Sequence, residues 1–152
     1  MPNLYGNILS SIGCGIVGGQ GVLPSANFGD RYAIFEPASQ YTCANLVGKD
    51  LANPCVFILA GINMLRHIKQ ESLPQCDTRV AFTELSTDVY FKHYKFFRRL
   101  DDYAELLQKS LYKVMFDDMI QTPDIGGTFH TSDIIENIKA EVIKRMQASK
   151  RG

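Results

Sequence analysis

Apolar residues in the first third of the chain follow two different periods. They recur at helical spacing from Ile8 to Val17, and the glycine pair at positions 18–19 is expected to end that helix. A glycine- and serine-containing loop is expected from there to about residue 30. Tyr32 to Phe35 then forms a short apolar and aromatic run between charged residues, which is typical of a buried strand. This pattern predicts a helix followed by a strand.

Helical spacing dominates the rest of the chain. Asn53 and Pro54 are expected to start a helix with proline at its first position, running through Leu65. Thr131 or Ser132 is expected to cap the last helix. The apolar stripes of the last two helices are Leu106, Leu107, Leu111, Val114 and Met115 in one, and Ile134, Ile135, Ile138, Val142 and Ile143 in the other. Together, these elements predict an α/β chain.

The first eleven residues, MPNLYGNILSS, read as the end of a strand, a glycine turn and the start of a helix. In an open α/β sheet, a turn of this kind at the carboxyl end of a strand is where binding sites lie. Asn7 and Ser11 are four residues apart and therefore share a helix face at that position. Neither side chain carries a charge. No strand precedes the turn, so the chain is expected to open within a fold.

Composition narrows the functional classes. The chain has 152 residues, 45% hydrophobic and 21% charged, which suits one core and one domain. Lys plus Arg equals Asp plus Glu at 16 each, so no net field favours nucleic acid or an anionic membrane. Glycines and Pro24 interrupt the longest uncharged apolar run, which argues against a membrane helix. No Arg-rich, acid-poor leader is present, so no transit peptide is expected.

The four cysteines show no pairing motif. Because no C-x-x-C spacing occurs, neither a disulfide framework nor a zinc site is indicated, and buried or incidental thiols are expected. The cysteines are Cys14, Cys43, Cys55 and Cys76.

Five segments in order carry a resemblance to a known family. They are MPNLYGNILSS (1–11), GIVGGQGVLPSANFGDRYAIFEPA (15–38), GKDLANP (48–54), MLRHI (64–68) and TPDIGG (122–127). With these segments the chain resembles the isocitrate and isopropylmalate dehydrogenases, most closely the mitochondrial NAD-dependent isocitrate dehydrogenases. The resemblance implies part of a three-layer α/β/α fold that lacks the N-terminal half, and a location in the mitochondrial matrix. It also implies NAD and Mg²⁺ or Mn²⁺ as cofactors of the holoenzyme.

The resemblance also assigns roles to the first helix. Catalytic members carry two metal-binding aspartates four residues apart after this turn, at the positions of Asn7 and Ser11. Hard divalent cations prefer charged oxygen ligands, so this chain is not expected to hold the metal alone. Asn7 could still offer an amide oxygen to a metal held by a partner, or cap the turn. The tyrosine, lysine and arginines that the family uses in catalysis precede this turn, so no catalytic residue is assigned here.

The loop that holds adenosine in catalytic members differs here. Residues 37–45 read PASQYTCAN, one residue longer and without the family's histidine and aspartate, which resembles the regulatory subunits. Gln40 and Tyr41 are candidates for contact with an allosteric nucleotide. Asn53 corresponds to the asparagine that meets adenine, although a helix cap before Pro54 is an equal explanation. Asp124 is expected to cap a tight turn at the double glycine.

Residues 70–99 have no counterpart in the family. Joining Lys69 to Leu100 restores the family's helix spacing, so the chain is expected to be a single partial domain with an insertion at about 70–99. The basic aromatic run at 90–99 reads as a solvated or partner-binding loop, as sequence without an evolved role, or as an RNA-stacking strip.

These observations lead to one main functional hypothesis. The chain is expected to be a regulatory, non-catalytic subunit or fragment of an NAD-dependent isocitrate dehydrogenase. Its partner would be the catalytic subunit, and its effector an allosteric nucleotide or citrate; neither nucleic acid nor a membrane is expected as a partner. Two alternatives stay open, a catalytic subunit in a longer native form and a gene product without function.

Overall fold

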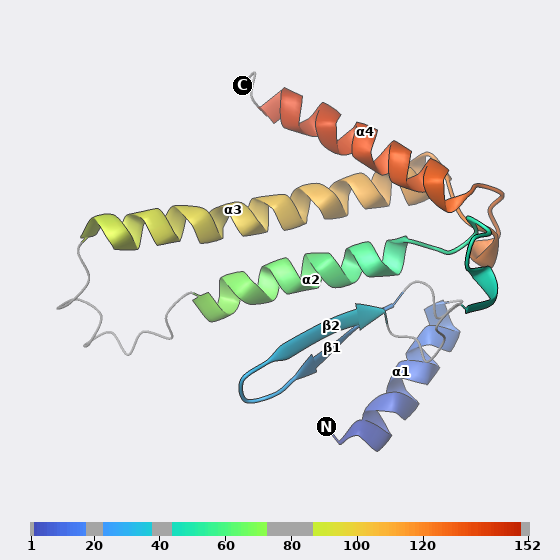
Figure 1. Ribbon diagram of the computed structural model, residues 1–152, viewed down its shortest axis with the longest axis horizontal. Helices are drawn as coiled ribbons and strands as arrows, with labels where there is room; N and C mark the ends of the chain where they lie inside the picture. Colours follow the sequence, from blue (N-terminus) through green and yellow to red (C-terminus); the bar gives the residue numbers. More distant parts are fainter. Residues whose placement is uncertain (1, 18–22, 38–43, 73–86, 150–152) are drawn as a thin grey trace.

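The computed structural model describes residues 2–17, 23–37, 44–72 and 87–149. Two antiparallel strands and three long helices lie in sequence after an N-terminal helix (Figure 1). The helices are α1 (Asn3–Val17), α2 (Cys55–Ser72), α3 (Thr87–Tyr112) and α4 (Thr131–Ser149). The strands are β1 (Pro24–Phe28) and β2 (Ala33–Pro37). The chain is therefore of the α/β class, as its sequence pattern predicts.

Helix α1 begins earlier than the sequence suggests. The strand end and glycine turn expected before it are wrong, because the helix starts at Asn3 and runs through Gly6. The backbone N–H of Gly6 donates to the carbonyl of Pro2 at 3.0 Å, so the glycine lies in the first helical turn. Proline is well tolerated just at a helix start because it has no N–H to donate.

The hairpin corrects two other expectations. Residues 24–28 form strand β1 rather than a loop, because Ala26 pairs with Phe35 and Phe28 with Ala33 in an antiparallel ladder. Pro24 opens the strand, where its missing N–H breaks no interior ladder bond. Strand β2 is only partly buried, since its alternate residues face out and Ile34 is 58% exposed. The ring of Phe35, by contrast, lies 5.3 Å from that of His67 in α2.

The core lies where α2, α3 and α4 meet. It is built from most of the apolar stripes predicted for the last two helices, although Ile143, expected on the core face, is 55% exposed. A single helical turn after α3, Lys113–Asp117, adds to the core with π-helical hydrogen bonding. The buried members are Cys55, Leu111, Val114, Met115, Ile134 and Ile138. Helix α2 is central in Figure 1, with α3 packed on one side and the hairpin on another.

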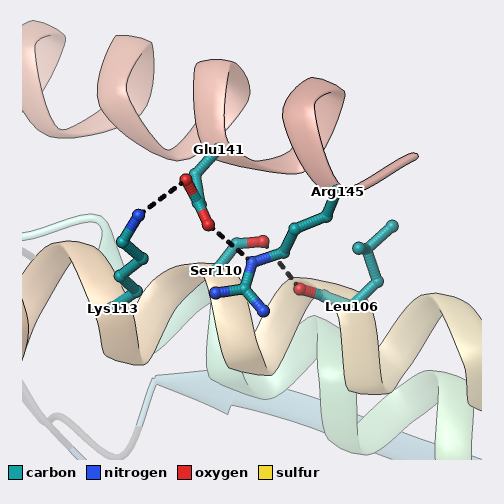
Figure 2. Close-up of polar contacts among 5 residues, drawn as sticks. All are labelled: Leu106, Ser110, Lys113, Glu141 and Arg145. Atoms are coloured by element: carbon teal, nitrogen blue, oxygen red, sulfur yellow. Dashed lines mark hydrogen bonds and ion pairs between the residues drawn. The ribbon is translucent and has the colours of Figure 1, made fainter. Parts of the chain in front are cut away.

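Ion pairs tie the helices together around this core. Lys69 of α2 pairs with Asp101 of α3. Glu141 of α4 accepts hydrogen bonds from Lys113 at 3.1 Å and from Nε of Arg145 at 2.7 Å, and Figure 2 shows its carboxylate between the two cations. The bond from Lys113 is the main reason that the pKa of Glu141 lies below its usual 4.5, and Arg145 adds to it, while burial opposes both.

The second half of the expected insertion is helical. Because α2 extends to Ser72 and α3 begins at Thr87, the interpretation of the basic aromatic run as a loop is wrong. The sequence has neither glycine nor proline between Pro74 and Pro123, so nothing breaks a helix that starts early. Among the described residues, no helix is long and apolar enough to cross a bilayer.

Candidate functional site

The predicted metal-site positions lie on the solvent-facing surface of α1. Asn7 and Ser11 are both exposed, and α1 contains no charged residue along its whole length. An amide and a hydroxyl four residues apart share a face but bring no negative charge to it. This donor set does not fit a hard divalent cation. Within the described ranges, no group of three or more His, Cys, Asp or Glu side chains is placed to hold a metal ion.

The second site residue, Asn53, lies at the start of α2. Its side-chain oxygen accepts a hydrogen bond from the backbone N–H of Cys55 at 3.0 Å, and its amide nitrogen donates to a carboxylate oxygen of Asp124 at 3.0 Å. The first bond is the N-cap interaction expected before Pro54. The oxygen can accept a second hydrogen bond and the NH2 group can donate a second one, so a nucleotide contact by Asn53 would not need to break either of these bonds.

The turn that carries Asp124 is built on two glycines. Gly126 has a φ of 91°, and a Cβ on Gly127 would lie 1.9 Å from the carbonyl oxygen of Gln121. The backbone N–H of Gly127 donates to the carbonyl of Thr122 at 2.9 Å, which closes the turn. Asp124 was expected to cap this turn, and its described side-chain bond instead reaches Asn53, 71 residues away. The turn therefore fixes the loop before α2.

A carboxylate that the sequence analysis missed caps α4. Asp50 accepts hydrogen bonds from the backbone N–H of Ser132 at 3.1 Å and from the Ser132 hydroxyl, and its own carbonyl accepts from the N–H of Thr131 at 2.9 Å. The Asp133 carboxylate accepts from the N–H of His130 at 3.0 Å. The expected caps, Thr131 and Ser132, instead donate their hydroxyls to Ala52 and Asp50.

The segment from Asp50 to Asn53 is thus held from both sides. Asp50 has a φ of 53°, which is unusual for a residue other than glycine, and its bonds to α4 account for that conformation. No signal in the sequence links Asp50 to Ser132, because 82 residues separate them and no motif joins the two. Only the folded structure brings these residues together.

The thiol of Cys55 lies beneath this junction and is not poised for chemistry. Burial, with a smaller contribution from the nearby Asp124 carboxylate, raises the pKa of Cys55 to about 12. Cys14 is buried as well, so two of the four cysteines are the buried thiols that were expected. The nucleotide candidates Gln40 and Tyr41, together with Cys43 and Cys76, lie outside the described residues.

Comparison with known proteins identifies the family. The sequence profile described as isocitrate/isopropylmalate dehydrogenase matches residues 1–78, which contain α1, the hairpin and α2. The chain belongs to this family. Its match thus covers Asn7, Ser11 and Asn53, the three described positions to which the resemblance gave roles.

Within this family, the chain is similar to subunits of mitochondrial NAD isocitrate dehydrogenases. It is 35% identical over 148 residues to isocitrate dehydrogenase [NAD] subunit 1, mitochondrial, of Schizosaccharomyces pombe, an alignment that covers 97% of this chain and 32% of that protein. It is 34% identical over 138 residues to the gamma subunit of Macaca fascicularis, covering 91% of this chain and 28% of that subunit. It is 30% identical over 138 residues to the beta subunit of Bos taurus, with 91% and 28% covered.

A solved structure agrees with this placement. The crystal structure of isocitrate dehydrogenase from Methylococcus capsulatus superposes with a TM-score of 0.65 and 27% sequence identity, over 92% of this chain and 33% of that one. The resemblance to the family and its fold are therefore confirmed. The chain spans about a third of the length of the relatives that it matches.

Proposed function

We propose that this chain is a regulatory, non-catalytic subunit, or a fragment of one, of an NAD-dependent isocitrate dehydrogenase. The observation that carries the proposal is the uncharged face of α1 with Asn7 and Ser11 on it. By the resemblance, these two residues correspond to the family's two metal-binding aspartates. Without carboxylates there, the chain lacks the charge needed to bind the divalent cation that oxidative decarboxylation of isocitrate to 2-oxoglutarate requires. Its role is then to support a partner that does the chemistry.

The partner in this proposal is the catalytic subunit of the same enzyme. The names of the relatives support it, since they are numbered or lettered subunits of mitochondrial NAD isocitrate dehydrogenases. On the same grounds we place the protein in the mitochondrial matrix. NAD and Mg²⁺ or Mn²⁺ then bind the holoenzyme on the catalytic subunit, and the described residues of this chain position loops rather than ligands.

The candidate nucleotide-binding residues have different roles in this proposal. Asn53 caps α2 and is tied to Asp124, so it holds the end of the Asp50–Asn53 segment in place. Gln40 and Tyr41 remain the candidates for direct contact with an allosteric nucleotide. Citrate is the other candidate effector.

Activity measurements test the proposal. We expect the purified chain alone to form no NADH from isocitrate and NAD with Mg²⁺. Co-expressed with the catalytic subunit from its own genome, it should raise NADH formation at low isocitrate concentration, by a factor on the order of 10. Turnover by this chain without a partner would contradict the proposal, as would a catalytic subunit whose kinetics do not respond to it.

Metal binding gives a sharper test of the α1 face. The double variant Asn7→Asp with Ser11→Asp restores two carboxylates on one helix face, and it should bind Mn²⁺ more tightly than the unchanged chain in a spin-resonance titration. The matched control is Ser10→Asp with Ser11→Asp, which adds the same charge at two consecutive exposed positions that do not face each other. Equal Mn²⁺ affinity of the two variants would show that these positions are not a disabled metal site.

A further inference from the structure

The loop between β2 and α2 is anchored by residues 50–53, close to its C-terminal end. Residues 44–49, which precede this segment, are held by local bonds, such as that from the backbone N–H of Lys49 to the carbonyl of Leu46 at 3.1 Å. Residues 50–53 instead bond to parts of the chain that lie 71 to 82 positions away. Figure 1 shows this segment at the end of the molecule where α2 and α4 begin. The fold therefore fixes this loop from its C-terminal side.

Asp50 anchors the segment while it holds an uncommon backbone conformation. Its carboxylate accepts from the hydroxyl of Ser132 and from the N–H of the same residue at 3.1 Å, and its carbonyl accepts from the N–H of Thr131 at 2.9 Å. Its φ of 53° lies in the left-handed region, which residues with a Cβ seldom adopt. Such strain persists only where the surroundings impose it, and it gathers at functional sites. The bonds to α4 therefore have a consequence for the loop as well as for the helix.

These bonds do more than cap α4. Thr131 and Ser132 lie at the start of that helix and are residue types that can cap it with their own hydroxyls. They direct those hydroxyls to the loop instead, at Ala52 and Asp50. Helix α4 is itself fixed in the core through Ile134, which is completely buried. Because one end of each bond is fixed in this way, the loop takes its position from the core.

The chain that Asp50 anchors leads to the candidate nucleotide residues. Gln40 and Tyr41 precede it in the same loop, and Asn53 follows it by three positions. A carboxylate repels anionic phosphates, so Asp50 is not expected to touch a nucleotide itself. We propose that Asp50 is a positioning residue, whose bonds to α4 hold the loop ready for an allosteric nucleotide. This inference rests on the proposed function, in which the loop residues contact that nucleotide.

Loss of this anchor should weaken nucleotide binding without changing the rate at saturation. If the loop keeps its binding arrangement in only about a tenth of the molecules, the apparent affinity falls about tenfold. Saturating nucleotide restores the arrangement, so the maximal rate is kept. Asp50→Gly removes the carboxylate and suits the left-handed backbone, so it tests the bonds rather than the strain. Asp50→Asn keeps an oxygen for the Ser132 N–H and also tolerates this backbone, so it should restore most of the affinity.

The test uses the holoenzyme, in which this chain is co-expressed with the catalytic subunit from its own genome, and adenosine diphosphate (ADP) as the probe. The ADP concentration for half-maximal activation should rise roughly tenfold for Asp50→Gly and less than about twofold for Asp50→Asn, with the saturated rate unchanged. The matched control is Asp133→Ala, which removes another carboxylate from the start of α4, one that accepts from the N–H of His130 at 3.0 Å. It should lower the melting temperature, as Asp50→Gly does, but leave the ADP response unchanged.

Hydrogen exchange of the same holoenzyme measures the anchoring without a nucleotide. The amides of residues 44–49 should exchange faster in Asp50→Gly than in the unchanged protein, and Asp133→Ala should not alter them. Equal exchange in Asp50→Gly and the unchanged protein would overturn the inference.

The ADP measurements can overturn the inference in further ways. An ADP response that Asp133→Ala weakens as much as Asp50→Gly does would assign the effect to helix stability, and a failure of Asp50→Asn to restore it would exclude the bonds as its cause. An unaltered ADP response in Asp50→Gly would overturn the inference and leave the proposed function intact. A holoenzyme in which the unchanged chain brings no response to ADP would count against the allosteric nucleotide itself, and the inference would fail with it.

Discussion

The first and last helices of this chain, α1 and α4, are both amphipathic but pack in opposite ways. Helix α4 turns the apolar residues of its first half inward, so that Ile134 is completely buried and Ile138 is 5% exposed. Helix α1 has a comparable apolar stripe and leaves it in solvent, with Ile16 81% exposed. The difference lies in the neighbours, since α2 and α3 provide a surface for α4 and no described element does so for α1. An amphipathic sequence is enough to predict each helix, but the presence of a packing partner decides whether its apolar face is buried.

The largest expected difference in stability comes from truncating one isoleucine in α4 and one in α1. Ile134→Ala removes a fully buried side chain and should lower the free energy of unfolding by about 3 kcal/mol, as large-to-small core substitutions do. Ile16→Ala should change it by less than about 0.5 kcal/mol. Urea unfolding followed by circular dichroism, at a concentration where the chain is monomeric, measures both. Similar losses for the two variants would mean that α1 packs on the chain after all.

Two glycine-to-alanine substitutions, one in the turn before α4 and one in α1, test the same comparison. In the turn before α4, Gly127→Ala would force a Cβ into the backbone of Gln121 and should cost about 2 kcal/mol. In α1, Gly15 has nothing within 4 Å of an added Cβ, so Gly15→Ala should raise stability by about 0.5 kcal/mol through better helix propensity. Thermal melts of the two variants should therefore shift in opposite directions. A shift in the same direction would contradict the contrast between a tight turn and an open helix.

Part of this contrast could be predicted from the sequence and part could not. The apolar periods correctly indicated helices over α2 and α4, and the Asn53–Pro54 pair correctly marked a helix start, because these signals are local. Strand β1 was missed because its stability depends on pairing with β2 rather than on its own residues. The cap that Asp50 provides was missed because it joins residues 82 apart. The sequence also showed the apolar stripe of α1, but not that it faces solvent.

The ion pair between Glu141 of α4 and Lys113 should make the stability of the folded chain depend on pH. The pKa of Glu141 is lowered in the folded state, chiefly by its bond from Lys113, so its contribution to stability is present above the usual pKa of 4.5 and is lost as the pH falls below that value. Glu141→Gln should therefore cost about 1 kcal/mol at neutral pH. The cost should shrink toward zero as the carboxylate is protonated.

Unfolding measured at neutral pH and again well below pH 4.5 checks this behaviour. The control is Glu136→Gln on the same helix, whose side chain is exposed and belongs to none of the ion pairs among the described residues. A cost for Glu141→Gln that stays constant with pH would assign its effect to packing rather than to charge.

The smallest expected effect concerns the buried hydroxyl of Thr122, in the turn before α4. Thr122 is completely buried, and its hydroxyl has no hydrogen-bond partner among the described residues, while its carbonyl closes the turn before α4. A buried hydroxyl without a partner opposes folding, so Thr122→Val keeps the shape and removes the penalty. We expect a gain of up to about 1 kcal/mol in urea unfolding. Ser110→Ala is the comparison, because its hydroxyl donates to the carbonyl of Leu106 at 2.8 Å and its loss should bring no gain (Figure 2). If Thr122→Val instead destabilises the chain, that hydroxyl has a partner, and the turn that positions Asp124 depends on it.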